Sequence, residues 1–148
     1  MTRVLGRYSE QVFTVTRIVF GVLFACHGAQ KLFGVLGGVG GAGKTVPLAS
    51  LFGLAGTIEF FGGVLIAIGF MASYAAFIAA GEMAVAYFMV HARRAPWPIQ
   101  NLGEPAVLYC FAFLYIAARG AGRWSVDAAL LGRTSRPSGQ VGQASYRP

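Results

Sequence analysis

Apolar residues along the chain form four long stretches, and polar residues gather between these stretches and at the two ends. A helix needs about 20 predominantly apolar residues to cross a bilayer. The pattern therefore predicts four membrane-spanning helices, the last of them short, at residues 17–36, 48–70, 73–91 and 105–119. The predicted fold class is all-α, a transmembrane four-helix bundle.

The connections between the predicted spans differ in length. Residues 37–47 form a glycine-rich loop, and residues 92–104 form a second long loop. Met71 and Ala72 alone separate the second span from the third. We therefore expect the second and third helices to be antiparallel neighbours.

The composition supports lipid as the solvent of this chain. Of its 148 residues, 56% are hydrophobic and 11% are charged, with a mean hydropathy of +0.62. Soluble domains carry about 25% charged residues. A chain this apolar has too few polar residues to cover the surface of a soluble domain.

The basic residues flank the apolar stretches, which is typical of headgroup anchoring and topology control and argues against nucleic-acid binding. Eight arginines lie before or at the start of the first span and after the fourth, against three basic residues in the long loops. This excess predicts that both termini are cytoplasmic, with residues 1–16 as an N-terminal segment and residues 132–148 as a disordered tail around the transmembrane domain 17–131. The eight are Arg3, Arg7, Arg17, Arg119, Arg123, Arg133, Arg136 and Arg147, and the three are Lys44, Arg93 and Arg94.

Two carboxylates fall inside predicted spans, where each costs roughly 2.5 to 3.5 kcal/mol to insert and usually marks function. Glu59 is eleven residues from position 48, Glu82 is nine from His91, and His27 is nine from position 36. At 1.5 Å per residue, all three lie roughly 14–16 Å below the outer surface. With Lys31 one turn above His27, these residues predict an intramembrane polar site of His27, Lys31, Glu59 and Glu82.

The same residues also fit other interpretations. Glu59 and Glu82 could form structural ion pairs with Lys31 and Arg17, or keep a proton and donate a hydrogen bond. A histidine and two glutamates on three helices could hold a metal or haem, although the Glu-x-x-His spacing of di-iron bundles is absent. Small residues that would let the helices approach closely are Gly53, Gly56, Gly62, Gly63, Gly69 and Gly81.

Three further groups of residues have candidate roles. His91, Asn101 and Glu104 are expected at the outer rim of the bundle. Cys26 and Cys110 are either packing residues or a pair of redox thiols, if the first and fourth helices are adjacent. After the fourth span, a short amphipathic segment at 125–131 is expected, with Ser125 as its cap and Trp124 as an interfacial anchor.

Residues 38–45 match the phosphate-loop pattern G-x-x-x-x-G-K-[ST] letter by letter. A phosphate loop needs a β-strand before it and a helix after it. Here a predicted membrane helix precedes the segment, and Asp127, the one aspartate of the chain, is not placed to hold magnesium. We therefore interpret Gly38–Thr45 as a flexible loop and expect no nucleotide binding.

Three segments resemble the DoxX family of small bacterial inner-membrane proteins. The stretch GVLFACHGAQKLFG at residues 21–34 resembles the first-helix signature of that family, and Glu59 with the glycines that follow resembles its second helix. The sequence GRWSVD at 122–127 resembles its closing motif. The resemblance covers residues 17–131 and implies an inner-membrane four-helix bundle linked with redox chemistry, in quinol oxidase or thiosulfate:quinone oxidoreductase complexes or beside oxidative-stress proteins.

Three functional hypotheses follow. The favoured one is an accessory or scaffold subunit of a membrane redox system, non-catalytic itself, whose polar interior binds a quinone headgroup or a small apolar ligand. The second is a small transporter or proton relay, which the lack of internal repeats and broken helices weakens. The third is a stand-alone oxidoreductase that uses Cys26 and Cys110 or a bound metal. A quinone is favoured over a metal or haem as cofactor, and the expected partners are lipid and membrane or peripheral redox proteins.

Overall fold

The computed structural model describes residues 6–131, and every regular element among them is helical. The segment α2–η2–α3 is one continuous helical rod with a π-helical turn at η2, and α4 continues into the π-helical turn η3. The elements are η1 (Gly6–Tyr8), α1 (Ser9–Phe33), α2 (Leu51–Thr57), η2 (Ile58–Gly62), α3 (Gly63–Ile68), α4 (Ala72–Ala86), η3 (Tyr87–His91), α5 (Pro98–Asn101), α6 (Glu104–Arg119) and α7 (Val126–Leu131).

In the described part of the chain, three helical segments are long and apolar enough to cross a membrane, at Gly6–Phe33, Leu51–Ile68 and Ala72–His91. They coincide with the first three predicted spans, although α1 begins at Ser9, well before the predicted residue 17, and ends at Phe33. The fourth helix, α6, has 16 residues and stays short of the length a membrane crossing usually needs. Large apolar side chains cover the outer faces, including Leu23, Phe77 and Phe111, as expected of a protein surrounded by lipid.

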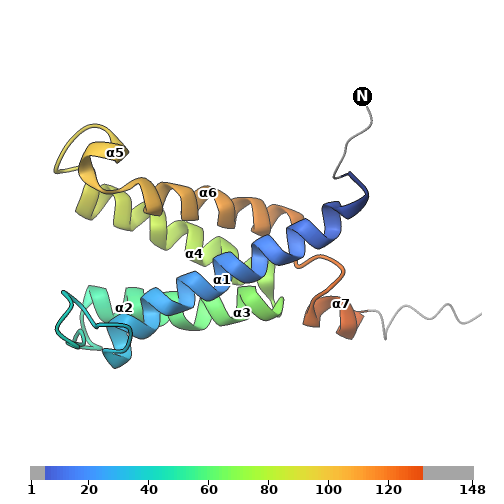
Figure 1. The fold of residues 1–148 in the computed structure, drawn as a ribbon, viewed down its shortest axis with the longest axis horizontal. Helices are drawn as coiled ribbons and strands as arrows, with labels where there is room; N and C mark the ends of the chain where they lie inside the picture. Colours follow the sequence, from blue (N-terminus) through green and yellow to red (C-terminus); the bar gives the residue numbers. More distant parts are fainter. Residues whose placement is uncertain (1–5, 132–148) are drawn as a thin grey trace, which may run out of the picture.

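The helices pack as two pairs (Figure 1). In one pair α1 lies along α2–η2–α3, and in the other α4 lies along α6. The pairs meet mainly where α3 and η2 contact α4, beside a tight turn in which Gly69 and Met71 both have positive φ. The prediction that the second and third helices are adjacent and antiparallel is therefore confirmed.

Helix α1 approaches its partner to backbone contact. A Cβ placed on Gly28 would lie 2.2 Å from the Phe60 nitrogen, and one on Gly63 would lie 2.6 Å from the Gly21 oxygen. No side chain larger than a hydrogen fits at these positions without separating the helices. Close packing over glycine supplies van der Waals contact, which lipid-embedded helices need in place of the hydrophobic effect.

The glycines expected to lie at helix contacts divide into two groups. Gly56 does face α1, where a Cβ would lie 3.0 Å from the Lys31 Cβ. Gly62 and Gly81 do not lie at a contact, because a Cβ on either would meet nothing within 4 Å. The prediction was wrong for these two residues, since composition alone does not tell which side of a helix meets a neighbour.

A buried arginine on α1 binds the end of helix α3. Arg17 is 1% exposed, and its guanidinium donates hydrogen bonds to the carbonyls of Ile66 and Ala67 and, at 2.8 Å, to that of Trp124. Arg17 therefore binds backbone oxygens, not Glu59 or Glu82 as the ion-pair interpretation suggested.

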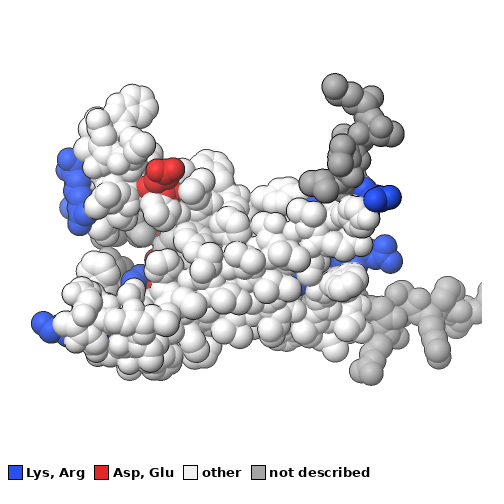
Figure 2. Space-filling model, viewed as in Figure 1, with Lys and Arg blue, Asp and Glu red and all other residues white. Residues whose placement is uncertain are grey.

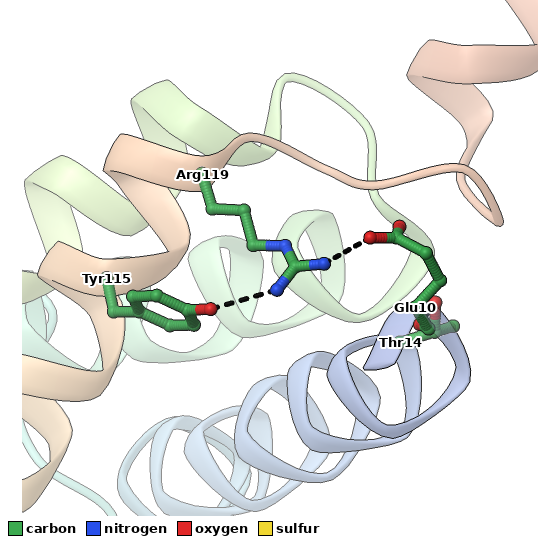
Figure 3. A network of polar contacts seen from close by, with 4 residues as sticks. All are labelled: Glu10, Thr14, Tyr115 and Arg119. Carbon is green, nitrogen blue, oxygen red and sulfur yellow. Dashed lines mark hydrogen bonds and ion pairs between the residues drawn. The ribbon is translucent and has the colours of Figure 1, made fainter. Parts of the chain in front are cut away.

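A second group of polar contacts, around Arg119, joins α1 to α6 at the same end of the molecule (Figure 3). Arg119 donates to the Glu10 carboxylate and, at 2.9 Å, to the Tyr115 hydroxyl, and its guanidinium lies 4.0 Å from the centre of the Phe13 ring. The start of α1 and the end of α6 are therefore neighbours. The loops that precede α2 and α5 lie at the opposite end of the molecule (Figure 1).

The remaining sequence predictions concern short segments. Ser125 caps α7 as expected, because its hydroxyl accepts a hydrogen bond from the Ala128 nitrogen at 3.1 Å. The segment Gly38–Thr45 lies in the loop that follows helix α1, where a Val39–Lys44 bridge closes a turn. The predicted disordered tail at 132–148 lies outside the described residues.

Candidate functional site

A cavity of about 400 Å³ lies between the two helix pairs. Figure 2 shows the molecule hollowed on the side of the α2 and α5 ends, with basic atoms visible in the hollow. All four long helical segments contribute to its wall: Phe24, His27 and Lys31 from α1; Leu51, Phe52, Leu54, Ala55, Ile58 and Glu59 from α2–η2; Ile78, Glu82, Met83, Val85, Ala86, Met89, Val90 and His91 from α4–η3; Pro105, Ala106 and Tyr109 from α6.

The wall of this cavity holds a partly buried ion pair. The Lys31 Nζ atom lies 2.5 Å from the Glu59 Oε1 atom, and the Glu59 side chain is 3% exposed. Lys31 is in the last turn of α1, and its Cα–Cβ bond tilts back toward the start of the helix, so the stem can bring the ammonium toward Glu59. The pair links α1 to the π-helical turn η2.

Two carboxylate oxygens in the cavity wall have no partner. Both Glu59 Oε2 and Glu82 Oε2 are buried and have no hydrogen-bond partner among residues 6–131. A buried polar atom left unpaired costs about 1–3 kcal/mol, and more when it is charged. Such atoms in a cavity wall are suited to receive a ligand or a proton.

His27 and Tyr109 form the side of the cavity between α1 and α6. Their rings meet edge to face with centroids 6.1 Å apart, and the Tyr109 ring also packs 5.5 Å from that of Phe24. Sequence reasoning named His27 and missed Tyr109. The available signal was a pair of tyrosines in the fourth apolar stretch, Tyr109 and Tyr115, and spacing along one helix did not show which of them faces the cavity.

Both π-helical turns border the cavity. Glu59 lies in η2, and Met89, Val90 and His91 lie in η3. A π-helical turn inserts an extra residue and rotates the side chains that follow, and such turns occur frequently at functional sites. No residue pattern in the sequence indicated them.

The predicted rim residues are only partly brought together. His91 Nδ1 lies 3.0 Å from the Asn101 carbonyl, and the buried Asn101 side chain bonds the Ala95 carbonyl and the Gly103 nitrogen at 2.9 and 2.8 Å. This cluster fastens α5 to the end of η3. Glu104 is exposed at the start of α6, with no side-chain hydrogen bond to His91 or Asn101.

The residues considered for thiol or metal chemistry lie on several different helices. Cys26 on α1 and Cys110 on α6 are both half-buried and free. Between residues 6 and 131, no three side chains of the His, Cys, Asp or Glu type are grouped closely enough to hold a metal ion.

Comparisons with known proteins agree with the resemblance found in the sequence. A family model described as DoxX matches residues 12–92. An uncharacterized protein of Haemophilus influenzae is 36% identical over 130 residues, which is 83% of this chain and 93% of that protein. No solved structure matches.

Proposed function

This chain belongs to the DoxX family of membrane proteins, and we propose that it is an accessory subunit of a membrane redox system whose intramembrane cavity binds a small amphipathic molecule of the quinone class. Its own side chains would bind and orient the head group. The oxidised or reduced partner would be a separate membrane or peripheral protein.

The observation that carries the ligand-binding proposal is the form of the cavity. Its wall is built mainly from apolar side chains, and it converges on Lys31, Glu59 and Glu82. Small-molecule sites typically combine apolar walls with a few convergent polar groups. His27 and Tyr109 add ring surfaces and hydrogen-bonding atoms to one side, where an aromatic head group could stack.

We further propose that all four long helices cross the bacterial inner membrane as a bundle, with both termini in the cytoplasm. The hydrogen bond between Glu10 and Arg119 supports an even number of crossings, since it joins the start of α1 to the end of α6. The excess of arginine near the two chain ends supports the cytoplasmic assignment.

The test is ligand binding by protein purified in mild detergent. Native mass spectrometry during titration with decylubiquinone, and separately with its reduced form, should show one molecule bound per chain. Glu59→Gln should weaken binding at least about tenfold, because it breaks the ion pair in the cavity wall. Glu104→Gln, at an exposed carboxylate outside the cavity, should bind as the wild type does. Equal binding by both variants would contradict the proposed site.

A proton relay is a second candidate, and the unpaired oxygens of Glu59 and Glu82 favour it. Two carboxyl groups in one membrane cavity can exchange protons with a ligand or with water. Proteoliposomes loaded with a pH-sensitive dye should then collapse an imposed pH gradient faster than empty liposomes do, and Glu82→Gln should abolish the difference. Equal rates for protein-loaded and empty liposomes would remove this function.

A further inference from the structure

Two carboxylate oxygens in the cavity wall have no hydrogen-bond donor beside them among the described residues. These are Glu59 Oε2 and Glu82 Oε2, whereas one of the three N–H groups of the Lys31 ammonium is donated to Glu59 Oε1. His91 is likewise occupied, since its Nδ1 atom lies against the Asn101 carbonyl. Glu59 already accepts a hydrogen bond on its other oxygen, so Glu82 is the carboxyl group with the greater need of a donor from a ligand.

Acidic groups also outnumber the lysine ammonium in the cavity wall. Two carboxyl groups, Glu59 and Glu82, line it against one ammonium, Lys31. The other basic group buried in the bundle, Arg17, binds three backbone carbonyls and does not line the cavity. His27 and Tyr109 face the cavity from the α1–α6 side, and neither forms a hydrogen bond to Glu82 in the structure. A ligand group that donates a hydrogen bond to Glu82 would pair its buried free oxygen.

The mouth of the cavity indicates the rest of the ligand. Eight residues both line the cavity and are exposed on the outer surface, and all of them except His27 are apolar. The apolar ones lie on α2 (Leu51, Phe52 and Leu54), on α4–η3 (Ile78, Val85 and Met89) and at the start of α6 (Pro105). In a membrane protein such an edge is in contact with acyl chains, so an apolar ligand body can reach the cavity from lipid.

We propose that the cavity selects amphipathic ligands whose head donates a hydrogen bond, as a hydroxyl or an ammonium group does, over ligands whose head only accepts one. This selectivity rests on the proposed ligand-binding function. Glu82 is the specificity-determining residue, because its free oxygen is satisfied by a donor and left unpaired by a carbonyl or an ether. For a quinone-class ligand, the form bearing hydroxyl groups should bind more tightly than the form bearing carbonyls.

Matched ten-carbon probes test the selectivity on the full chain in detergent. Decanol, decylamine and decyl methyl ether differ in the head group, and binding is measured by native mass spectrometry and by the shift in unfolding temperature. We expect decanol or decylamine to bind at least about tenfold more tightly than the ether, the loss expected when a buried acceptor stays unpaired. Preference for the amine identifies an ammonium ligand, and preference for the alcohol identifies a hydroxyl ligand.

The variants separate selectivity from binding. Glu82→Leu should remove the preference for a donor while the ether still binds, and Glu104→Gln should leave the preference unchanged. If the wild type binds the ether as tightly as the alcohol and the amine, the selectivity is overturned, although ligand binding stands. If no probe binds and neither form of decylubiquinone binds, both the selectivity and the proposed function fail.

Discussion

Arg17 and Asp127 form hydrogen bonds to opposite sides of the turn between α3 and α4. Arg17 donates to the last carbonyls of α3, while the Asp127 carboxylate accepts from the Met71 and Ala72 nitrogens that open α4, at 2.9 and 3.2 Å. Helix ends carry unpaired backbone groups, and a cation at a C-terminus or an anion at an N-terminus complements them. The closing segment of the chain therefore completes the turn that joins the two helix pairs.

Replacement of Arg17 by methionine should destabilise the protein more than replacement of Asp127 by alanine. Arg17→Met leaves three carbonyls without this donor, each worth about 1–3 kcal/mol when buried, whereas loss of a capping carboxylate costs about 1 kcal/mol. Unfolding followed by circular dichroism during titration with dodecyl sulfate measures both. Arg123→Met, at an exposed arginine, is the matched control and should change stability little.

Gly28→Ala should loosen the contact between α1 and η2. The added methyl group would lie 2.2 Å from the Phe60 nitrogen, and this backbone atom moves only if the helices separate. We expect a loss of about 1–3 kcal/mol, as for other overpacked interiors, in the same unfolding assay. Gly81→Ala is the control, since its methyl group meets nothing within 4 Å. Equal stability of the two variants would contradict the close helix contact.

The helices and the polar site could be predicted because the bilayer imposes simple constraints. Length and hydropathy located the spans, and counting residues from their ends placed Glu59 and Glu82 at one depth. In the structure both residues line one cavity with His27 and Lys31. The predicted start of the first helix was less accurate, because α1 continues toward the N-terminus through polar residues such as Glu10 and Thr14, which lie outside the apolar stretch.

What the sequence did not predict depends on which helix faces meet. The wall position of Tyr109, the open surroundings of Gly62 and the carbonyl partners of Arg17 are set by the arrangement of helices around the bundle. Depth in the membrane carries no information on that arrangement. The π-helical turns also lack a residue signature, because they arise from a local extra residue in an otherwise ordinary helix.

Lys31→Met should destabilise the protein by roughly 3–5 kcal/mol, since it leaves the buried Glu59 carboxylate without its ion-pair partner. The double variant Lys31→Met, Glu59→Gln should recover most of that loss, because it buries no uncompensated charge. The coupling between the two positions follows from a double-mutant cycle in the dodecyl sulfate assay. Losses that simply add would show that the ion pair contributes nothing to folding.

The two long loops should lie on the side of the membrane opposite to the chain ends. Single cysteines are introduced into a background that carries Cys26→Ala and Cys110→Ala, and intact cells are treated with a membrane-impermeant maleimide. Val39→Cys in the first loop and Pro96→Cys in the second are both at exposed positions and should be labelled from outside.

Arg7→Cys and Arg123→Cys, also exposed but near the two chain ends, should be labelled only after the cells are opened. This pattern follows from the Glu10–Arg119 bond, which places the start of α1 beside the end of α6, together with the excess of arginine at that end. Labelling of Val39→Cys and Arg123→Cys from the same side would require an even number of crossings between them. In that case α6, with its 16 residues, would not span the membrane.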